Sequence, residues 1–195
     1  MKKIILSLAI VAFATLGVSA QVNFGVKGGL NISTLRTDPD GNSKSLVGGY
    51  GGFLANIPVS GMFSIQPEVL YSLEGAKYDG AGDPQLLLNY INIPLMVKYS
   101  DPSGFYGELG PQIGILTSAK FQEDGESDVD IKKLLKSSNF SLGFGAGWNF
   151  SPKVGVGLRY NLGLSSIGED SGNDVKTGNF AIGIHYMFGG GSAAQ

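Results

Sequence analysis

Apolar residues occupy every even position from Val154 to Leu164, and glycine or polar residues occupy the odd positions between them. A similar alternation runs from Phe140 to Phe150 and from Phe180 to Phe188. Alternation with a period of two indicates a β-strand with one apolar and one polar face. The apolar faces of three such strands in succession must be covered by a large apolar environment. A second sheet would supply it in a soluble sandwich, whereas a lipid bilayer supplies it to every strand of a closed barrel.

The first twenty residues resemble a secretory signal. Lys2 and Lys3 precede an apolar run of about 13 residues that ends near Val18-Ser19-Ala20. This run is shorter than the roughly 20 residues that a membrane-spanning helix needs. We therefore expect a cleaved signal peptide over 1–20, one barrel domain over 21–188 and a C-terminal tail over 189–195.

Period-two runs and turn signals predict eight strands in the mature chain. They cover Val22–Leu35, Gly48–Ile57, Met62–Glu74, Leu86–Tyr99, Phe105–Lys120, Asn139–Phe150, Val154–Ser165 and Asn179–Phe188. Their connections alternate between short turns and long polar loops. The short turns are 58–61, 100–104 and 151–153, and the long loops are 36–47, 75–85, 121–138 and 166–178.

This alternation of connections is typical of outer-membrane barrels, which have short periplasmic turns and long external loops. The expected fold is all-β, an eight-stranded antiparallel up-and-down transmembrane β-barrel. With an even number of strands, both termini are expected on the periplasmic side of the outer membrane.

Charge is unevenly distributed along the chain. Without Lys2 and Lys3 there are 12 basic and 16 acidic residues, a net charge of −4, so no basic footprint for nucleic acid exists. Twelve of the acidic residues fall in the four long loops. They are Asp38, Asp40, Asp79, Asp83, Glu123, Asp124, Glu126, Asp128, Asp130, Glu169, Asp170 and Asp174.

The polar faces predict an interior network in the half of the barrel nearest the short turns. Its expected members are Lys27, Glu68, Lys98, Glu108, Arg159 and His185. Three cations and two carboxylates at one level favour hydrogen-bonded ion pairs that close the lumen. The last three strands place glycines on their inward face, which leaves room for these long side chains. Because eight strands enclose only enough space for side chains to fill, we expect a plugged barrel rather than a porin.

Several aromatic residues lie within two residues of a short turn or of the chain end, on the apolar face. They are Phe63, Tyr99, Phe105, Trp148, Phe150 and Phe188. Aromatic rings at that height predict a periplasmic girdle at the level of the lipid headgroups. The alternative is a set of core aromatics in a soluble barrel.

No residue pattern predicts a metal, a cofactor or an enzyme. The segment Asp38–Asn42 places its glycine fourth rather than sixth for a calcium loop, so an acidic solvated loop is expected there. His185 has cations and glycines as its expected neighbours and no nucleophile, which favours a satisfied interior histidine. The run Ile131–Lys136 has helix-forming composition and predicts a short turn of helix in the third long loop.

Three segments resemble the strand motifs of the PorT-like outer-membrane β-barrel family. They are Phe24-Gly-Val-Lys-Gly-Gly-Leu-Asn-Ile-Ser33, Gln66-Pro-Glu-Val-Leu-Tyr-Ser72 and Tyr90-Ile-Asn-Ile-Pro-Leu-Met-Val-Lys-Tyr99. The resemblance covers almost the whole mature chain, and the last segment is its most distinctive part. It implies an eight-stranded outer-membrane barrel of a porin-like family without a demonstrated pore, and it carries no catalytic residues. The tail after Phe188 departs from barrels of this kind, which often end at an aromatic residue.

We expect an integral outer-membrane barrel that acts in envelope structure, in surface interaction or as a component of an envelope assembly. A narrow channel for ions or small solutes is the alternative. A soluble barrel that carries a ligand would require the apolar residues inside and the charges outside. The expected partners of this monomer are outer-membrane lipid and an envelope protein that the sequence does not identify.

Overall fold

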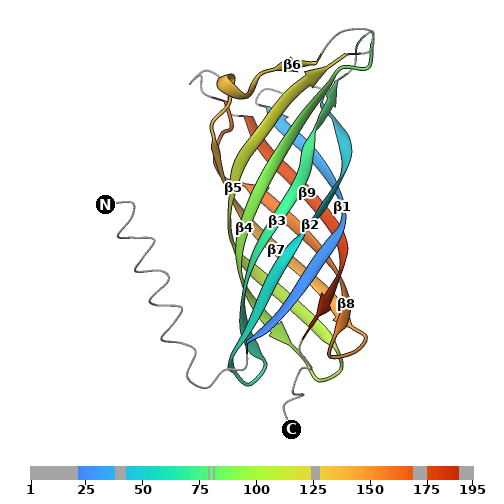
Figure 1. Ribbon diagram of the computed structural model, residues 1–195, viewed down its shortest axis with the longest axis vertical. Coiled ribbons are helices and arrows are strands. Elements are labelled where there is room, and N and C mark those ends of the chain that lie inside the picture. The colour runs from blue at the N-terminus through green and yellow to red at the C-terminus, as the bar shows by residue number, and fades with distance from the viewer. Residues whose placement is uncertain are drawn as a thin grey trace, which may run out of the picture.

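The computed structural model describes residues 22–37, 43–78, 80, 82–123, 128–168 and 175–188. The predicted signal peptide, the tail over 189–195 and the segment Asp38–Asn42 lie outside these ranges, as do several of the acidic loop residues. In the described part the chain is almost entirely β-strand (Figure 1). No helix in this part is long and apolar enough to cross a membrane.

Eight long strands make up the barrel. They are β1 (Asn23–Thr37), β2 (Ser43–Ser60), β3 (Phe63–Tyr78), β4 (Gln85–Ser100), β5 (Phe105–Gln122), β7 (Ser138–Asn149), β8 (Val154–Gly163) and β9 (Val175–Met187). A two-residue strand, β6 (Val129–Asp130), and a 3₁₀ turn, η2 (Lys132–Leu134), lie in the connection between β5 and β7. With 10 to 18 residues, each long strand reaches the length of about 9 to 11 residues that spans a bilayer.

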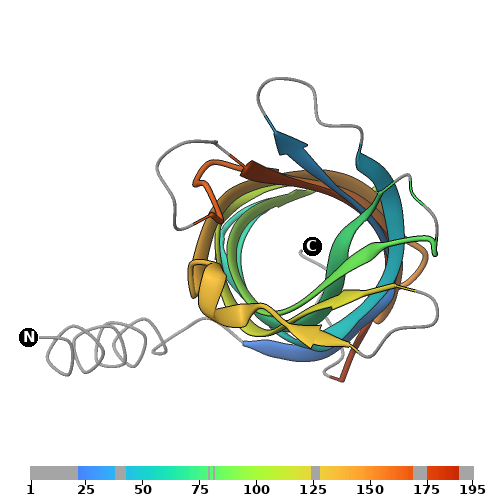
Figure 2. The ribbon, with the colours of Figure 1, turned by 90° about the horizontal axis from the view of Figure 1, so that it is seen from above.

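The eight strands close into a ring (Figure 2). Each long strand pairs in antiparallel fashion with the next one along the chain, and β9 pairs with β1 over Gly25↔Met187 to Thr37↔Val175. Closure satisfies the backbone hydrogen-bonding groups of every strand, which is what a lipid surround requires. The predicted eight-stranded up-and-down barrel is therefore confirmed.

Three strands extend four or more residues beyond the sequence pattern at one end. Strand β3 ends at Tyr78 instead of Glu74. Strand β2 starts at Ser43 instead of Gly48, and a register shift between Ser45 and Tyr50 breaks the alternation there. Strand β9 starts at Val175 instead of Asn179 and pairs with β1 along this extra length. Backbone hydrogen bonding to the neighbouring strand therefore continues into segments where apolar and polar residues no longer alternate.

The short connections lie at one end of the barrel, together with the start of β1 and the end of β9 (Figure 1). In the turn between β4 and β5, the Asp101 carboxylate accepts a hydrogen bond from the Ser103 amide at 2.7 Å. Gly104 has a φ of +103°, which favours glycine, and its amide donates to the Asp101 carbonyl at 3.0 Å. We call this end the short-turn end and the opposite one the long-loop end.

The outer wall is apolar. Large hydrophobic side chains stand exposed on every long strand, with exposed fractions from 68% at Phe53 to 36% at Ile91. The charged residues that alternate with this apolar wall on β1, β3, β4, β5 and β8 are instead buried inside. They are Lys27, Glu68, Glu74, Lys98, Glu108 and Arg159. The soluble-barrel alternative needs the opposite arrangement and is wrong.

The interior is not polar throughout its height, which the sequence analysis missed. At the long-loop end a buried apolar cluster, here called the apolar plug, fills the barrel. It consists of Leu35, Ala76, Leu86, Leu88, Tyr90, Leu116, Ala119 and Ile167. Ile167 comes from the connection between β8 and β9, is fully buried, and accepts a hydrogen bond from the Lys136 amide at 2.9 Å. Two long connections thus meet over the barrel mouth.

Candidate functional site

Four charged side chains meet in the lumen of the barrel, and we call them the ionic plug. They are Lys27 of β1, Glu68 of β3, Glu108 of β5 and Arg159 of β8. Arg159 donates to both oxygens of Glu68, with Nη1 to Oε2 at 2.8 Å and Nη2 to Oε1 at 2.7 Å. Its Nε donates to Glu108 Oε1 at 2.7 Å.

Lys27 completes the ionic plug from the other side. Its ammonium lies 3.5 Å from Glu68 Oε1 and 3.7 Å from Glu108 Oε1. Each cation therefore contacts both carboxylates, and the four charges sum to zero.

The strand order makes these contacts span the barrel. Strands β3 and β8 lie four places apart in the ring of eight, so the Glu68–Arg159 pair crosses a full diameter. Strands β1 and β5 are also four places apart, and the Lys27–Glu108 pair crosses a second diameter a quarter of the ring away. Two crossing pairs occupy the centre of the lumen.

Burial makes these pairings necessary. Each of the four residues exposes 8% or less of its surface. A buried charge that loses its partner costs several kcal/mol, so each member depends on the others. A further hydrogen bond, from Gln66 Nε2 to Glu68 Oε1 at 2.7 Å, holds the carboxylate in place.

Two predicted members of the network lie beside it instead of within it. The Lys98 ammonium sits 3.8 Å from the centre of the Tyr106 ring, a cation–π contact. His185 packs edge-on against the same ring at 5.8 Å, and its Nε2 is 3.1 Å from Asn149 Oδ1. Neither forms an ion pair with any described residue. Sequence reasoning missed Tyr106, although it shares the inward parity of Glu108 on β5.

The glycine-rich wall receives the large side chains, as predicted. A side chain at Gly147 or Gly157 would collide with the Tyr106 ring, and one at Gly183 would collide with Tyr50. The Tyr106 hydroxyl donates to the Val156 carbonyl at 3.1 Å. The close approach of bulky residues to β7, β8 and β9 depends on these missing side chains.

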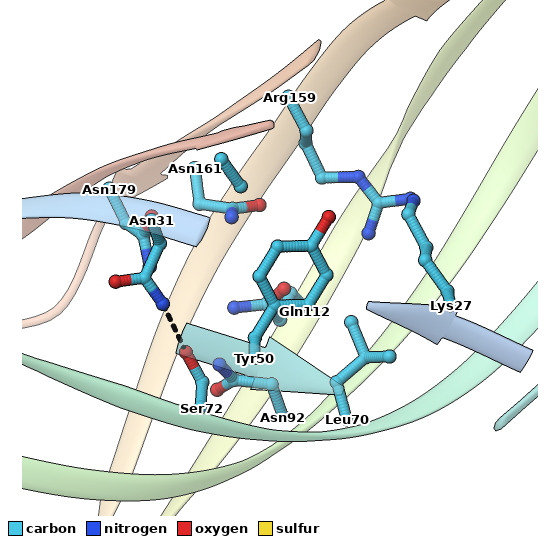
Figure 3. Close-up of a pocket in the computed structure, with 11 residues that line it drawn as sticks. Lys27, Asn31, Tyr50, Leu70, Ser72, Asn92, Gln112, Arg159, Asn161 and Asn179 are labelled. Carbon is cyan, nitrogen blue, oxygen red and sulfur yellow. Dashed lines mark hydrogen bonds between the residues drawn. The ribbon is translucent and has the colours of Figure 1, made fainter. Parts of the chain in front are cut away.

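A polar layer lies above the ionic plug. It encloses a cavity of about 20 Å³ that is lined by amides from several strands together with Lys27 and Arg159 (Figure 3). Asn31 Nδ2 donates to Ser72 Oγ at 2.9 Å, and Asn92 Nδ2 donates to the buried Glu74 carboxylate at 2.9 Å. The Tyr50 hydroxyl points toward the side where Lys27 and Arg159 lie. Glu74 lies an even number of residues after Glu68 on β3, so alternation places both side chains on the inward face. Glu74 was nevertheless not among the predicted interior residues.

The six predicted girdle residues lie near the short-turn end. Phe63, Phe105, Trp148, Phe150 and Phe188 are exposed on the outer wall. Tyr99 is half-buried and packs edge-on against Phe63, with 5.4 Å between the ring centres. Their role at the headgroup level stays a prediction.

At the long-loop end the predicted helical turn over 131–136 is a short 3₁₀ turn at Lys132–Leu134. Hydrogen bonds from Gln122 and Lys120 hold the pKa of the Asp128 carboxyl below its usual range. The described residues hold no group of three or more His, Cys, Asp or Glu side chains that fits a metal ion.

The fold is similar to that of solved outer-membrane proteins. Neisserial surface protein A aligns with a TM-score of 0.56 and 18% identity, over 85% of this chain and 97% of that one. Ail, the attachment invasion locus protein of Yersinia pestis, crystallised with the heparin analogue sucrose octasulfate, aligns with a TM-score of 0.51 and 19% identity, over 86% and 99%. No curated protein sequence matches the chain.

A family model described as an outer membrane protein beta-barrel domain matches residues 16–169, which is most of the chain. The matched region runs from before the barrel to the connection after β8 and includes all four members of the ionic plug. The chain therefore belongs to the outer membrane protein β-barrel domain family and resides in the outer membrane.

Proposed function

We propose that this protein is a closed barrel, not a pore, and that it serves envelope structure, surface contact or an envelope assembly through its long loops. The observation that carries the proposal is the pair of ion pairs that cross the lumen along two diameters. Because both pairs lie at one level, an ion passing through would have to separate them. Separation would leave buried charges without partners.

Two further layers support a closed lumen. The cavity in the polar layer has room for about one water molecule. Above it, the side chains of the apolar plug present a single polar group, the Tyr90 hydroxyl, which is too little to replace the hydration shell of an ion. A solute would need to displace all three layers in turn.

We also propose that the long loops face the outside and that both termini face the periplasm. The asymmetry between short turns and long loops supports this orientation. We further propose that residues 1–20 are removed as a signal peptide. We also propose that the protein is a PorT-like barrel, a resemblance that rests most on Ile93-Pro94-Leu95. The mass of the protein isolated from outer membranes tests the cleavage after Ala20.

Conductance in planar bilayers tests the closed barrel. We expect negligible steady current from the parent protein. A variant that removes all four charges of the ionic plug and weakens the apolar plug should conduct and so serves as the positive control for insertion and detection. It combines Lys27→Ala, Glu68→Ala, Glu108→Ala, Arg159→Ala and Ile167→Gly. Val69→Ala, on the lipid-facing side next to Glu68, should stay silent like the parent. A stable, ion-selective current from the parent at low voltage would contradict the proposal and favour a narrow channel.

A further inference from the structure

Three prolines are exceptions to the backbone pairing that closure gives every strand. They are Pro67 of β3, Pro94 of β4 and Pro111 of β5. A proline has no backbone N–H, so it cannot donate to the strand that it faces. Each of the three lies at a gap in the ladder between its strand and the preceding one, and the pairing resumes beyond that gap in the same register.

Each gap has the size that one missing donor produces. In an antiparallel ladder a residue pair is held by its own backbone bonds or by those of its neighbours, so the loss of one N–H removes two successive pairs. Every one of the three gaps removes two pairs and leaves the register unchanged. The pairs that border the gaps are Leu54↔Glu68 and Ile57↔Ile65, Pro67↔Leu95 and Leu70↔Asn92, and Pro94↔Gln112 and Val97↔Leu109.

The three gaps join into one line that crosses four strands, and we call it the proline line. They join because the residue after one proline faces the next proline. The line lies at the height of the ionic plug, since Glu68 belongs to both. Its opposed pairs, obtained by continuing the register across each gap, are Ala55 with Pro67, Glu68 with Pro94 and Leu95 with Pro111.

The other side of the barrel is continuous. The ladders that join β5 to β7, β7 to β8, β8 to β9, β9 to β1 and β1 to β2 are unbroken over their described length. The carbonyls that face the three prolines lack this backbone donor, and lipid supplies none. The wall is therefore weaker along the proline line than at the same height on the other side.

The ionic plug supports the wall at this line. The Glu68 backbone faces Pro94, whereas its side chain accepts two hydrogen bonds from Arg159 on the opposite wall, at 2.7 and 2.8 Å. Through Arg159 the middle gap is tied to the unbroken ladders on both sides of β8. In the gap between β2 and β3, a side-chain contact bridges the strands instead, because Asn56 Nδ2 donates to Ser64 Oγ at 2.8 Å.

From these observations we propose that the proline line is the place at which the barrel wall opens locally, and that the ionic plug keeps it closed. Separation of Glu68 from Arg159 removes the contact that holds the middle gap, so β3 and β4 move first. Segments that open locally are those with the fewest stabilising bonds. The proposal holds whichever surface role the long loops serve, and it assigns local motion to one wall while β7, β8 and β9 stay rigid.

Residue-resolved hydrogen exchange of the folded protein in lipid nanodiscs tests this proposal. The amides of Ala55, Glu68 and Leu95 report the proline line. Those of Gly145 and Ala181, the two register partners of the ionic-plug arginine on β8, report the unbroken wall at the same height. The protection factors at the proline line should be at least about tenfold lower, because one hydrogen bond changes an opening equilibrium by about that factor. Equal protection of the two sets would overturn the proposal.

Restoring the missing donors tests the cause of the weakness. The double variant Pro67→Val with Pro111→Val returns two N–H groups and keeps apolar side chains on the lipid-facing wall. It should raise the protection factors of Ala55 and Leu95 by about tenfold. Pro102→Val is the matched control, because Pro102 lies in the turn between β4 and β5, outside every ladder, and it should behave like the parent. No gain in the double variant, or an equal gain in the control, would refute the proposed cause.

The role of the ionic plug is tested with Arg159→Gln, which removes the charge from β8. Protection should fall at least about tenfold more at Glu68 and Leu95, on the opposite wall, than at Gly145 and Ala181 beside the substitution. A merely structural role for Arg159 predicts the reverse order, and that result would overturn the proposal. Glu68→Gln keeps the shape of the side chain and gives the same comparison with a smaller perturbation of the fold.

Discussion

Arg159 and Glu68 form a two-point contact across the full width of the barrel, with Nη1 to Oε2 at 2.8 Å and Nη2 to Oε1 at 2.7 Å. The two residues are 91 positions apart in sequence, and their strands are not neighbours in the sheet. Planar matching of a guanidinium with a carboxylate fixes both distance and orientation. The contact therefore ties opposite walls of the barrel together as well as filling its centre.

The first prediction concerns the balance of charge in the ionic plug. Glu68→Ala leaves two cations with the single carboxylate of Glu108 and should lower the free energy of unfolding by about 3–5 kcal/mol. Arg159→Ala leaves two carboxylates with Lys27 and should have a similar effect. The double variant retains the neutral Lys27–Glu108 pair, so it should be more stable than the sum of the two losses implies.

Denaturant titration in lipid vesicles measures all three variants against the parent. Ser72→Ala, in the neighbouring polar layer, serves as a control that removes one hydrogen-bond partner without changing the charge. Strict additivity of the two single effects would show that Glu68 and Arg159 are not energetically coupled.

The second prediction concerns the lipid-facing wall. Leu158 is 46% exposed in the middle of β8, and an arginine there should cost about 2–4 kcal/mol of stability in a bilayer. Val154 lies on the same face at the short-turn end of the strand, where the same substitution should cost roughly 0–1 kcal/mol. Unfolding titrations in vesicles compare the two variants. Equal costs at both depths would place the membrane differently along the barrel.

The third prediction concerns the space that glycine leaves for Tyr106. Gly157→Ala should destabilise the barrel by about 1–3 kcal/mol, because the new methyl group collides with the Tyr106 hydroxyl. In a Tyr106→Ala background the same change should cost much less. Gly51→Ala is the matched control, since a methyl group there meets only ordinary contacts. A cost for Gly157→Ala that does not depend on Tyr106 would point to the backbone instead of the clash.

The fourth prediction concerns orientation. The protein has no cysteine, so a single introduced thiol reports its own position. A membrane-impermeant maleimide added to intact cells should label Ser137→Cys, in the connection between β5 and β7, and leave Ser151→Cys unlabelled until the outer membrane is opened. Disrupted cells provide the control for reactivity at both sites. Preferential labelling at position 151 in intact cells would reverse the proposed orientation.

Local patterning was enough to predict the strands and their faces, because side chains alternate along a strand whatever lies elsewhere in the chain. The alternation around Leu158 and Arg159 assigns one residue to lipid and the other to the lumen. This assignment fails in Leu86-Leu87-Leu88, because three identical residues in a row do not show which of them face inward. Two of these three leucines belong to the apolar plug, so the apolar character of the upper interior was not predicted.

By itself, the sequence determined that the chain forms alternating strands with an apolar wall, short turns at one end and charged side chains on the inward face. Only the tertiary structure decided which of those charges meet. Lys27, Glu68, Glu108 and Arg159 come from every second strand of the closed ring, whereas Lys98 stacks on Tyr106 and His185 contacts Asn149. The physical reason is that inward parity is a local property, while contact across a lumen depends on closure and on the register of all eight strands.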